Sequence, residues 1–265
     1  MIPRRIVYCW YGGGEMSPVI RRCMATWPRV LDGYEIVRLD ETKCDLNANA
    51  YVRGAAQRRR WALVSDYFRI AELYARGGVY LDTDIECFHP FNDLLHNRAF
   101  FGYMYDGLLS CGVLGFEAGH PLLARVLQLY EGARWRADGQ RFEARMADGR
   151  ILNLNSNNPL LTVALLEAYP DMKLDGRRHA YPDFEILPRQ EFETGYVLRR
   201  GYCIHKAEAS WRGASAKARL TRAVKRCAQS VPGVHLEALI RNAASVRHTR
   251  KCIFYDRYKR DGGRI

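Results

Sequence analysis

Two aspartates separated by one residue are the group in this sequence best suited to chemistry. Asp82 and Asp84 follow a glycine pair and a short apolar run at 79–81. Two carboxylates this close repel each other. A divalent cation that prefers oxygen ligands, Mg²⁺ or Mn²⁺, relieves the repulsion and can bridge to substrate phosphates. An isolated Asp-x-Asp is more often a solvated turn, but its position at the end of an apolar strand favours a metal site.

A second pair, Asp66 and Arg69, is three residues apart, so both side chains share one face of a predicted helix. Taken alone, this spacing is typical of an exposed ion pair that contributes only about 0.3–0.5 kcal/mol. However, the apolar residues Phe68, Ile70 and Ala71 indicate that the helix packs on a sheet. The face that carries Asp66 and Arg69 is therefore expected to point into a cleft.

A third segment, residues 204–211, follows a late predicted strand and is rich in functional groups. It offers the imidazole of His205, the ammonium of Lys206, and the hydroxyl and indole of Ser210 and Trp211. A single histidine in such a place is more often structural. The combination nevertheless fits a loop that binds phosphate and metal.

These segments are positioned by an alternation of strands and helices that predicts an α/β fold with a largely parallel central sheet. In such sheets ligands bind outside the carboxyl ends of the strands. Gly12–Gly14, Asp82–Asp84 and the residues after His205 all follow predicted strands. We expect strands over residues 2–10, 34–39, 79–81, 99–103, 111–116 and 202–205, and helices over 17–30, 53–76, 120–130 and 159–169.

The net charge of +12 is concentrated near the C-terminus. Residues 212–265 contain 14 basic and 3 acidic side chains, whereas residues 1–211 contain 27 and 26. We therefore expect a nearly neutral catalytic domain at 1–211 and a basic helical appendage at 212–265. Basic amphipathic helices suit an anionic membrane surface, and the alternative is a helical pair packed on the body. A nucleic-acid-binding protein that uses the tail is a weaker hypothesis, because no recognised nucleic-acid motif accompanies the charge.

The pattern of cysteines and the hydropathy of the sequence indicate the cellular compartment of the protein. None of the eight cysteines forms a C-x-x-C pair, so a zinc cluster is not expected, and several lie in apolar runs typical of buried thiols. The N-terminus lacks the apolar core of a signal peptide, and no stretch approaches the ~20 apolar residues of a membrane span. We expect a cytoplasmic protein, with peripheral attachment to the inner face of the cell membrane if the basic region binds lipid.

Together the segments resemble the Asp-x-Asp sugar-transferase family known as glycosyltransferase family 32, of the capsular polysaccharide type. The resemblance runs in order through residues 1–211, and its most specific part is the combination of Ser65-Asp66-x-x-Arg69 with the block from Gly77 to Asp84. It implies a GT-A fold, a nucleotide-sugar donor (a UDP-sugar more than a GDP-sugar), Mn²⁺ or Mg²⁺, and retention of anomeric configuration. The further matching segments are Ile2–Trp10 with Gly12-Gly13, Cys111–Gly115 and Ile204–Trp211.

The resemblance also implies roles for the residues at the centre of the site. Asp82 and Asp84 would hold the metal and the donor, and His205 would help to coordinate the metal or the diphosphate. Asp66 and Arg69 would grip hydroxyls of the donor sugar. The candidate catalytic residues are therefore Asp66, Arg69, Asp82 and Asp84, and the candidate metal ligands are Asp82, Asp84 and His205.

The donor's nucleotide would be bound by residues farther out. Tyr8, Trp10 and Tyr11 would flank the nucleobase, while Ser210 and Trp211 would contact the phosphates. Members of the family often carry a second histidine directly after the first, and this chain has Lys206 there. Lys206 could supply positive charge to the leaving diphosphate, but the departure puts direct metal ligation at that position in doubt.

The acceptor side is less defined. The resemblance implies a cell-surface or capsular saccharide, lipid-linked, and a toxin-like transferase that modifies a protein is the alternative. Attack from the leaving-group face needs no enzyme nucleophile, so none is assigned. Four asparagines before Pro159 fit an acceptor loop or, equally well, a polar turn before a helix; they are Asn153, Asn155, Asn157 and Asn158.

Overall fold

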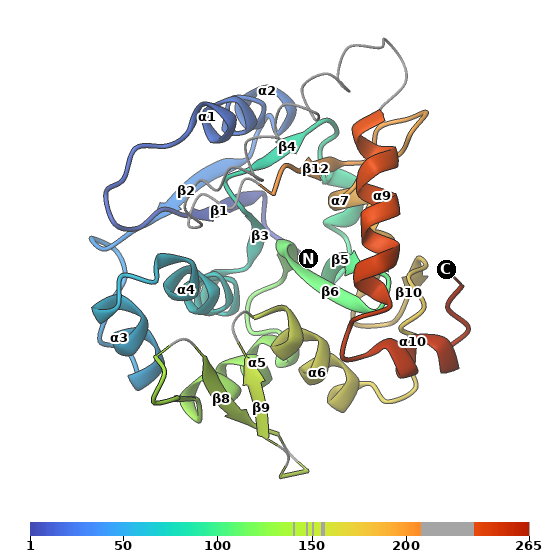
Figure 1. Cartoon of the computed structure of the whole chain (residues 1–265). Helices are drawn as coiled ribbons and strands as arrows, with labels where there is room; N and C mark the ends of the chain where they lie inside the picture. The colour runs from blue at the N-terminus through green and yellow to red at the C-terminus, as the bar shows by residue number, and fades with distance from the viewer. Residues whose placement is uncertain (140, 147, 150, 155–156, 208–235, 265) are drawn as a thin grey trace.

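The computed structural model describes the whole chain except residues 140, 147, 150, 155–156, 208–235 and 265 (Figure 1). The described strands are β1 (Arg5–Cys9), β2 (Glu35–Leu39), β3 (Gly78–Leu81), β4 (Ile85–Cys87), β5 (Ala99–Tyr105), β6 (Leu108–Phe116), β7 (Arg134–Trp135), β8 (Phe142–Arg145), β9 (Ile151–Leu154), β10 (His179–Ala180), β11 (Glu185–Leu187) and β12 (Cys203–His205). The described helices are α1 (Pro18–Met24), α2 (Trp27–Val30), α3 (Ala50–Gln57), α4 (Trp61–Arg76), α5 (Pro121–Glu131), α6 (Asn158–Ala168), α7 (Arg189–Phe192), α9 (Leu236–Thr249) and α10 (Tyr255–Arg260).

The central sheet has seven strands in the order β10-β11-β5-β6-β3-β1-β2. Strands β1, β2, β3, β5 and β11 run in one direction, while β6 and β10 run against them. A two-stranded ribbon pairs β4 with β12, and a three-stranded sheet joins β7, β8 and β9. The predicted α/β class with a mostly parallel central sheet is confirmed.

The central strands are apolar on both faces because each face is covered by a separate core. Val7 and Tyr80 point into a large core shared with α4, α5 and α6, whereas their neighbours Ile6, Val79 and Leu81 point into a second core with Trp27 and Phe192. A strand buried on both faces has a nearly continuous apolar sequence. This burial fixes β1 and β3 rigidly, together with the polar residues that follow them.

The helix predicted over residues 53–76 is wrong as a single element. Arg59 has a φ of 51°, a left-handed conformation that ends α3, and α4 begins two residues later. The helix predicted over residues 17–30 is also divided, into α1 and α2. Ser17 caps α1 by accepting a hydrogen bond from the backbone N–H of Ile20.

The C-terminal helices pack on the body. Thr249 is buried at the end of α9, and its hydroxyl accepts a hydrogen bond from the backbone N–H of Asp106. On α10 the aromatic ring of Tyr258 is also buried. The predicted boundary between residues 211 and 212 lies outside the described residues.

Two further predictions concern thiols and membrane spans. The seven described cysteines all have free thiols, and the eighth, Cys227, lies outside the described residues. Within the described part of the chain, no helix is both long and apolar enough to cross a bilayer.

Candidate active site

An acidic turn and a histidine meet at the carboxyl end of β3. Strand β3 leads into Asp82, and the backbone N–H of Ile85 donates to the Asp82 carbonyl to close the turn that contains Asp84. Strand β12 pairs antiparallel with β4 and places His205 opposite Ile85. His205 Nε2 therefore lies 3.1 Å from Asp84 Oδ1 and 4.0 Å from Asp82 Oδ2.

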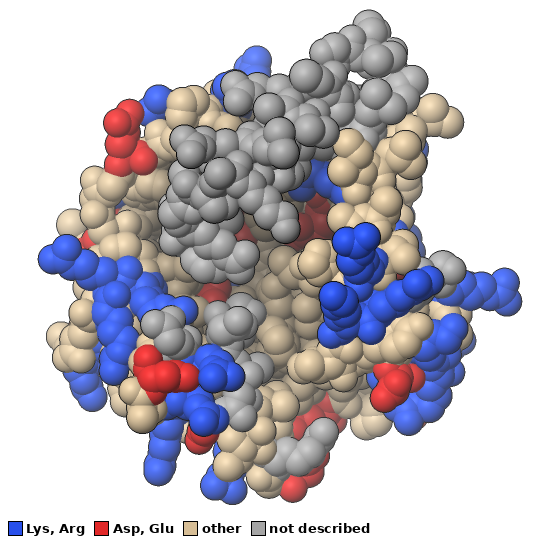
Figure 2. All heavy atoms as spheres, viewed as in Figure 1, with Lys and Arg blue, Asp and Glu red and all other residues tan. Residues whose placement is uncertain are grey.

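These three side chains form a donor set that fits a divalent cation. One ligand atom from each of Asp82, Asp84 and His205 lies within 4.8 Å of the others. Two carboxylate oxygens and one imidazole nitrogen can hold a divalent cation that keeps further coordination positions for water and substrate phosphate. Figure 2 shows acidic side chains at the bottom of a hollow in this face, with lysine and arginine side chains at its edges.

Glu193 contacts the side of the His205 ring that faces away from the two aspartates. No sequence pattern identified this residue as part of the site. Its Oε2 lies 2.8 Å from His205 Nδ1, and because a carboxylate only accepts, Nδ1 donates and Nε2 faces the two aspartates. Ser110 Oγ donates to the other oxygen of Glu193. Burial alone would lower the pKa of His205, but the carboxylates of Glu193 and Asp84 raise it well above its usual value. A carboxylate behind a ligating histidine is a common arrangement in metal sites.

Arg69 connects the helix α4 to the acidic turn. Its guanidinium lies 3.0 Å from Asp66 Oδ1 and 3.2 Å from Asp82 Oδ1, and it donates to the carbonyl of Cys111 at 2.6 Å. It also lies over the ring of Tyr80, 4.4 Å from the centroid. Asp66 and Arg69 are only 7% and 6% exposed, so the interpretation as an exposed ion pair is wrong.

Burial makes the negative charges in this cluster unfavourable. It raises the pKa of Asp66 to about 6, although Arg69 acts in the opposite direction. The pKa of Asp82 is also raised by burial, with Arg69 and His205 partly offsetting the effect. Carboxylates in this condition are stabilised by an additional cation.

Gly112 on β6 leaves room for the ligand side chains. A Cβ at this position would lie 3.2 Å from Asp82 Oδ2, 3.3 Å from Glu193 Oε1 and 3.3 Å from His205 Nδ1. Its carbonyl accepts a hydrogen bond from the backbone N–H of Asp82. Because Gly112 has no side chain, the backbone of β6 leaves the space in which the side chains of Asp82, Glu193 and His205 meet.

The proposed nucleobase residues lie at the carboxyl end of β1, which lies beside β3 in the parallel part of the sheet. Tyr8 contacts Trp27 edge to face, and the Trp10 indole donates to the Gly14 carbonyl at 2.9 Å. Both rings are partly exposed, whereas Tyr11 is 6% exposed and stacks on Trp61. Tyr8 and Trp10 are thus better placed than Tyr11 to contact a ligand.

The turn after β1 depends on glycine. Gly12 has a φ of 83°, and a Cβ there would lie 2.3 Å from the Trp61 indole nitrogen. A residue with a side chain would therefore be strained and crowded at position 12.

The remaining predicted residues are placed as follows. Lys206 Nζ lies 2.8 Å from Glu86 Oε2, so its charge is shared with a carboxylate beside the site. Asn157 donates to the carbonyl of Asp66, and Asn158 accepts from the backbone N–H of Cys111. These two asparagines hold backbone next to the site. Ser210, Trp211, Asn155 and the side chain of Asn153 lie outside what the structure describes.

Fold and site together point to the sugar-transferring enzymes that use an Asp-x-Asp motif. Residues 19–101 match the family described as "Glycosyltransferase sugar-binding region containing DXD motif". The matched region includes Asp66, Arg69, Asp82 and Asp84, but not His205 or Glu193. The mostly parallel sheet flanked by helices fits the predicted GT-A type of fold.

Two curated proteins are similar to parts of this chain. Inositol phosphoceramide mannosyltransferase 3 of Schizosaccharomyces pombe is 38% identical over 64 residues, which cover 24% of this chain and 18% of that protein. Human Alpha-1,4-N-acetylglucosaminyltransferase is 25% identical over 164 residues, covering 56% and 44%. The chain therefore spans less than half the length of these relatives.

Solved structures show a weaker likeness. The PaToxG glycosyltransferase superposes with a TM-score of 0.48 at 17% identity, covering 64% of this chain and 70% of that one. A glycosyltransferase involved in glycosylation of the major capsid of PBCV-1 gives 0.40 at 10% identity, covering 84% and 100%.

Proposed function

We propose that this protein is a metal-dependent retaining glycosyltransferase that moves a hexose from a nucleotide sugar to a saccharide acceptor. The observation that carries the proposal is the convergence of Asp82, Asp84 and His205 at the end of β3, joined through Arg69 to Asp66. Four of these five residues lie within the region that matches the sugar-binding family.

The donor's diphosphate is proposed to lie over Asp82 and Asp84. When bound there, a divalent cation neutralises the negative charge that develops on the departing nucleoside diphosphate. His205 contributes a ligand atom that Glu193 orients. The ammonium of Lys206 lies at the edge of this region and adds positive charge beside the diphosphate.

The donor sugar is proposed to contact Asp66 and Arg69. The Asp66 carboxylate accepts hydrogen bonds from sugar hydroxyls, and Arg69 holds Asp66 and Asp82 in fixed relative positions. The names of both curated relatives specify transfer of a hexose unit, mannosyl or N-acetylglucosaminyl, which supports a hexose donor. We favour a UDP-sugar, with the base beside Tyr8 and Trp10.

The acceptor is proposed to be a cell-surface or capsular saccharide on a lipid carrier, with the enzyme attached peripherally to a membrane. The anomeric configuration is retained if the acceptor hydroxyl attacks the sugar from the same face that the diphosphate leaves. This route requires no enzyme nucleophile. The anomeric configuration of the product, read by NMR, tests this part separately.

Release of nucleoside diphosphate from a panel of UDP- and GDP-sugars, with Mn²⁺ and with a chelator, tests the proposal. Wild-type protein should release the diphosphate from one donor only with the metal. Asp84→Ala should abolish release, whereas Asp138→Ala should not, because Asp138 is an exposed residue whose carboxylate pairs with Arg141. Metal-dependent release by Asp84→Ala at the wild-type rate would overturn the site assignment.

A further inference from the structure

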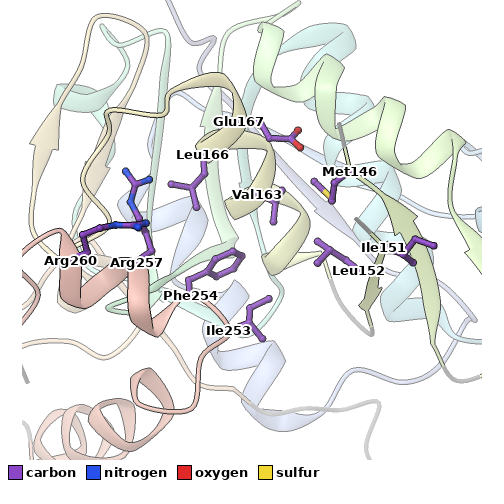
Figure 3. A pocket seen from close by; sticks show the side chains of 10 residues that line it. All are labelled: Met146, Ile151, Leu152, Val163, Leu166, Glu167, Ile253, Phe254, Arg257 and Arg260. Atoms are coloured by element: carbon purple, nitrogen blue, oxygen red, sulfur yellow. The ribbon is translucent and has the colours of Figure 1, made fainter. Parts of the chain in front are cut away.

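A groove separate from the acidic turn lies between β9, α6 and the segment that joins α9 to α10 (Figure 3). Its volume is about 560 Å³, within the range of sites that hold small organic ligands. The side chains of Leu152, Val163, Leu166 and Phe254 line it. The lining is therefore largely hydrocarbon, and it suits an alkyl chain.

The groove has exposed apolar side chains at its rim. Ile253 is 67% exposed and Ile151 is 48% exposed, and both line the groove. Isoleucine is usually buried in a folded protein, and adjoining exposed apolar residues mark a surface that contacts a partner or a membrane. These two residues extend the hydrocarbon of the groove outward into solvent.

Positive charge adjoins this apolar surface. Residues 250–264 include six lysines and arginines but only two aspartates. Arg257 is held by Asp261 and by backbone carbonyls, whereas Arg260 is exposed and pairs with none of the residues that the structure describes. The acidic residue in the lining, Glu167, is neutralised by Arg125 at 3.0 Å. The net charge next to the groove is therefore positive.

We propose that this groove binds an anionic phospholipid of a membrane, with an acyl chain along the groove and the phosphate on Arg260. Ile253 would enter the hydrocarbon of the same leaflet. Apolar residues that insert and basic residues that meet anionic headgroups are the two contributions on which peripheral membrane binding depends. Charge complementarity favours an anionic lipid over a neutral one, and an alkyl-lined groove favours a lipid over an acidic protein.

The same C-terminal helices connect this surface to the active site. Arg241 on α9 donates from both ends of its guanidinium, to the backbone carbonyl of His205 and to that of Lys206. Helix α9 then continues to the segment that carries Ile253. Lipid bound in the groove would thus hold the cleft at a constant distance from the bilayer, as a lipid-linked acceptor requires. This inference extends the membrane attachment proposed above.

Co-sedimentation of the full chain with vesicles tests the inference. Wild-type protein should bind vesicles of phosphatidylcholine mixed with phosphatidylglycerol more tightly than vesicles of phosphatidylcholine alone. Ile253→Asp should weaken binding at least tenfold although every basic residue remains, which separates the groove from the charge of residues 212–235. Arg260→Glu should weaken binding at least fivefold, since each basic residue near the surface contributes about 1 kcal/mol.

Matched controls place the same changes outside the groove. Leu198 is 81% exposed and Arg29 is an exposed residue of α2, so Leu198→Asp and Arg29→Glu should bind vesicles within twofold of wild type. The inference is overturned if wild-type protein fails to bind the anionic vesicles, or if Leu198→Asp weakens binding as much as Ile253→Asp does. Release of nucleoside diphosphate from soluble donor should be unchanged in Ile253→Asp, so the groove and the proposed transfer activity can fail independently.

Discussion

Replacing Glu193 by glutamine tests whether the carboxylate behind His205 matters for metal binding. The substitution keeps the shape of the side chain and removes its charge. A hydrogen bond to a charged group contributes about 1.5–3 kcal/mol and a neutral one about 0.5–1.5 kcal/mol. The loss of about 1–2 kcal/mol should raise the Kd for Mn²⁺ about 5- to 30-fold, which overlaps the 10–100-fold usual for such partners of metal ligands.

The assay can be made without any turnover. The EPR signal of free aqueous Mn²⁺ falls as the ion binds, so a titration of purified protein gives the Kd directly. Glu191→Gln is the matched control, because Glu191 lies in the short helix α7 that directly precedes Glu193 and pairs with Arg199 rather than with His205. Ser110→Ala removes a donor to Glu193 without changing charge and should raise the Kd by a smaller factor.

A Kd for Glu193→Gln within twofold of wild type would refute the reasoning, as would an equal loss in Glu191→Gln. In either case the negative charge of Glu193 would not be what strengthens metal binding at His205. It would then follow that the 2.8 Å contact between Glu193 and His205 has a structural role only.

Three other substitutions test neighbouring parts of the site. Asp66→Asn should abolish diphosphate release yet raise the free energy of unfolding at pH 7 by up to about 3 kcal/mol, because the folded-state pKa of about 6 exceeds the reference of 3.8. Arg69→Lys should lower the free energy of unfolding, measured by urea denaturation, by about 1–3 kcal/mol, because a lysine ammonium lacks the planar fork of donors that reaches both aspartates and the Cys111 carbonyl. Gly112→Ala should weaken Mn²⁺ binding in the EPR titration, since the methyl group crowds the Asp82 carboxylate.

Each of these predictions has its own check. For Asp66 the direction of the pH dependence is specific. As the pH rises from 4 to about 6, the carboxylate ionises in the unfolded chain before it does in the folded protein. The stability advantage of Asp66→Asn should therefore grow over this interval and then level off. An advantage independent of pH would contradict it. Arg76→Lys, on an exposed part of the same helix, should change stability by no more than about 0.5 kcal/mol. Gly14→Ala has open space around its Cβ and should leave the Kd unchanged.

The parts of the fold that follow from local patterns could be predicted from the sequence. Strands β1 and β3 are nearly uninterrupted apolar runs, and α4 ends at residue 76 as expected, followed by Gly77 with a φ of 66°. The break between α3 and α4 was not predictable in the same way. Helical spacing continues across Arg58–Arg60, and only the backbone of Arg59 shows that the helix ends there.

The site was predictable where its residues lie in one motif, and not where distant segments meet. Asp82 and Asp84 are separated by a single residue in the sequence, so their chemistry is apparent from the motif. Glu193 follows a four-residue helix and carries no motif, and its role depends on the docking of α7 against β12. The pairing of Lys206 with Glu86 likewise depends on the β4–β12 ribbon, which spacing alone did not indicate.

The pairing of β4 with β12 also determines when, during synthesis and folding, the Asp84–His205 pair can form. Asp84 leaves the ribosome long before His205, and the two side chains meet only when β12 adds to the edge of β4. Contacts between such distant segments form late in folding, because the intervening loop must first be ordered. A nascent chain that ends before β12 therefore holds two repelling carboxylates without their imidazole partner. Capture of Mn²⁺ at the proposed site would therefore report that β12 has docked on β4.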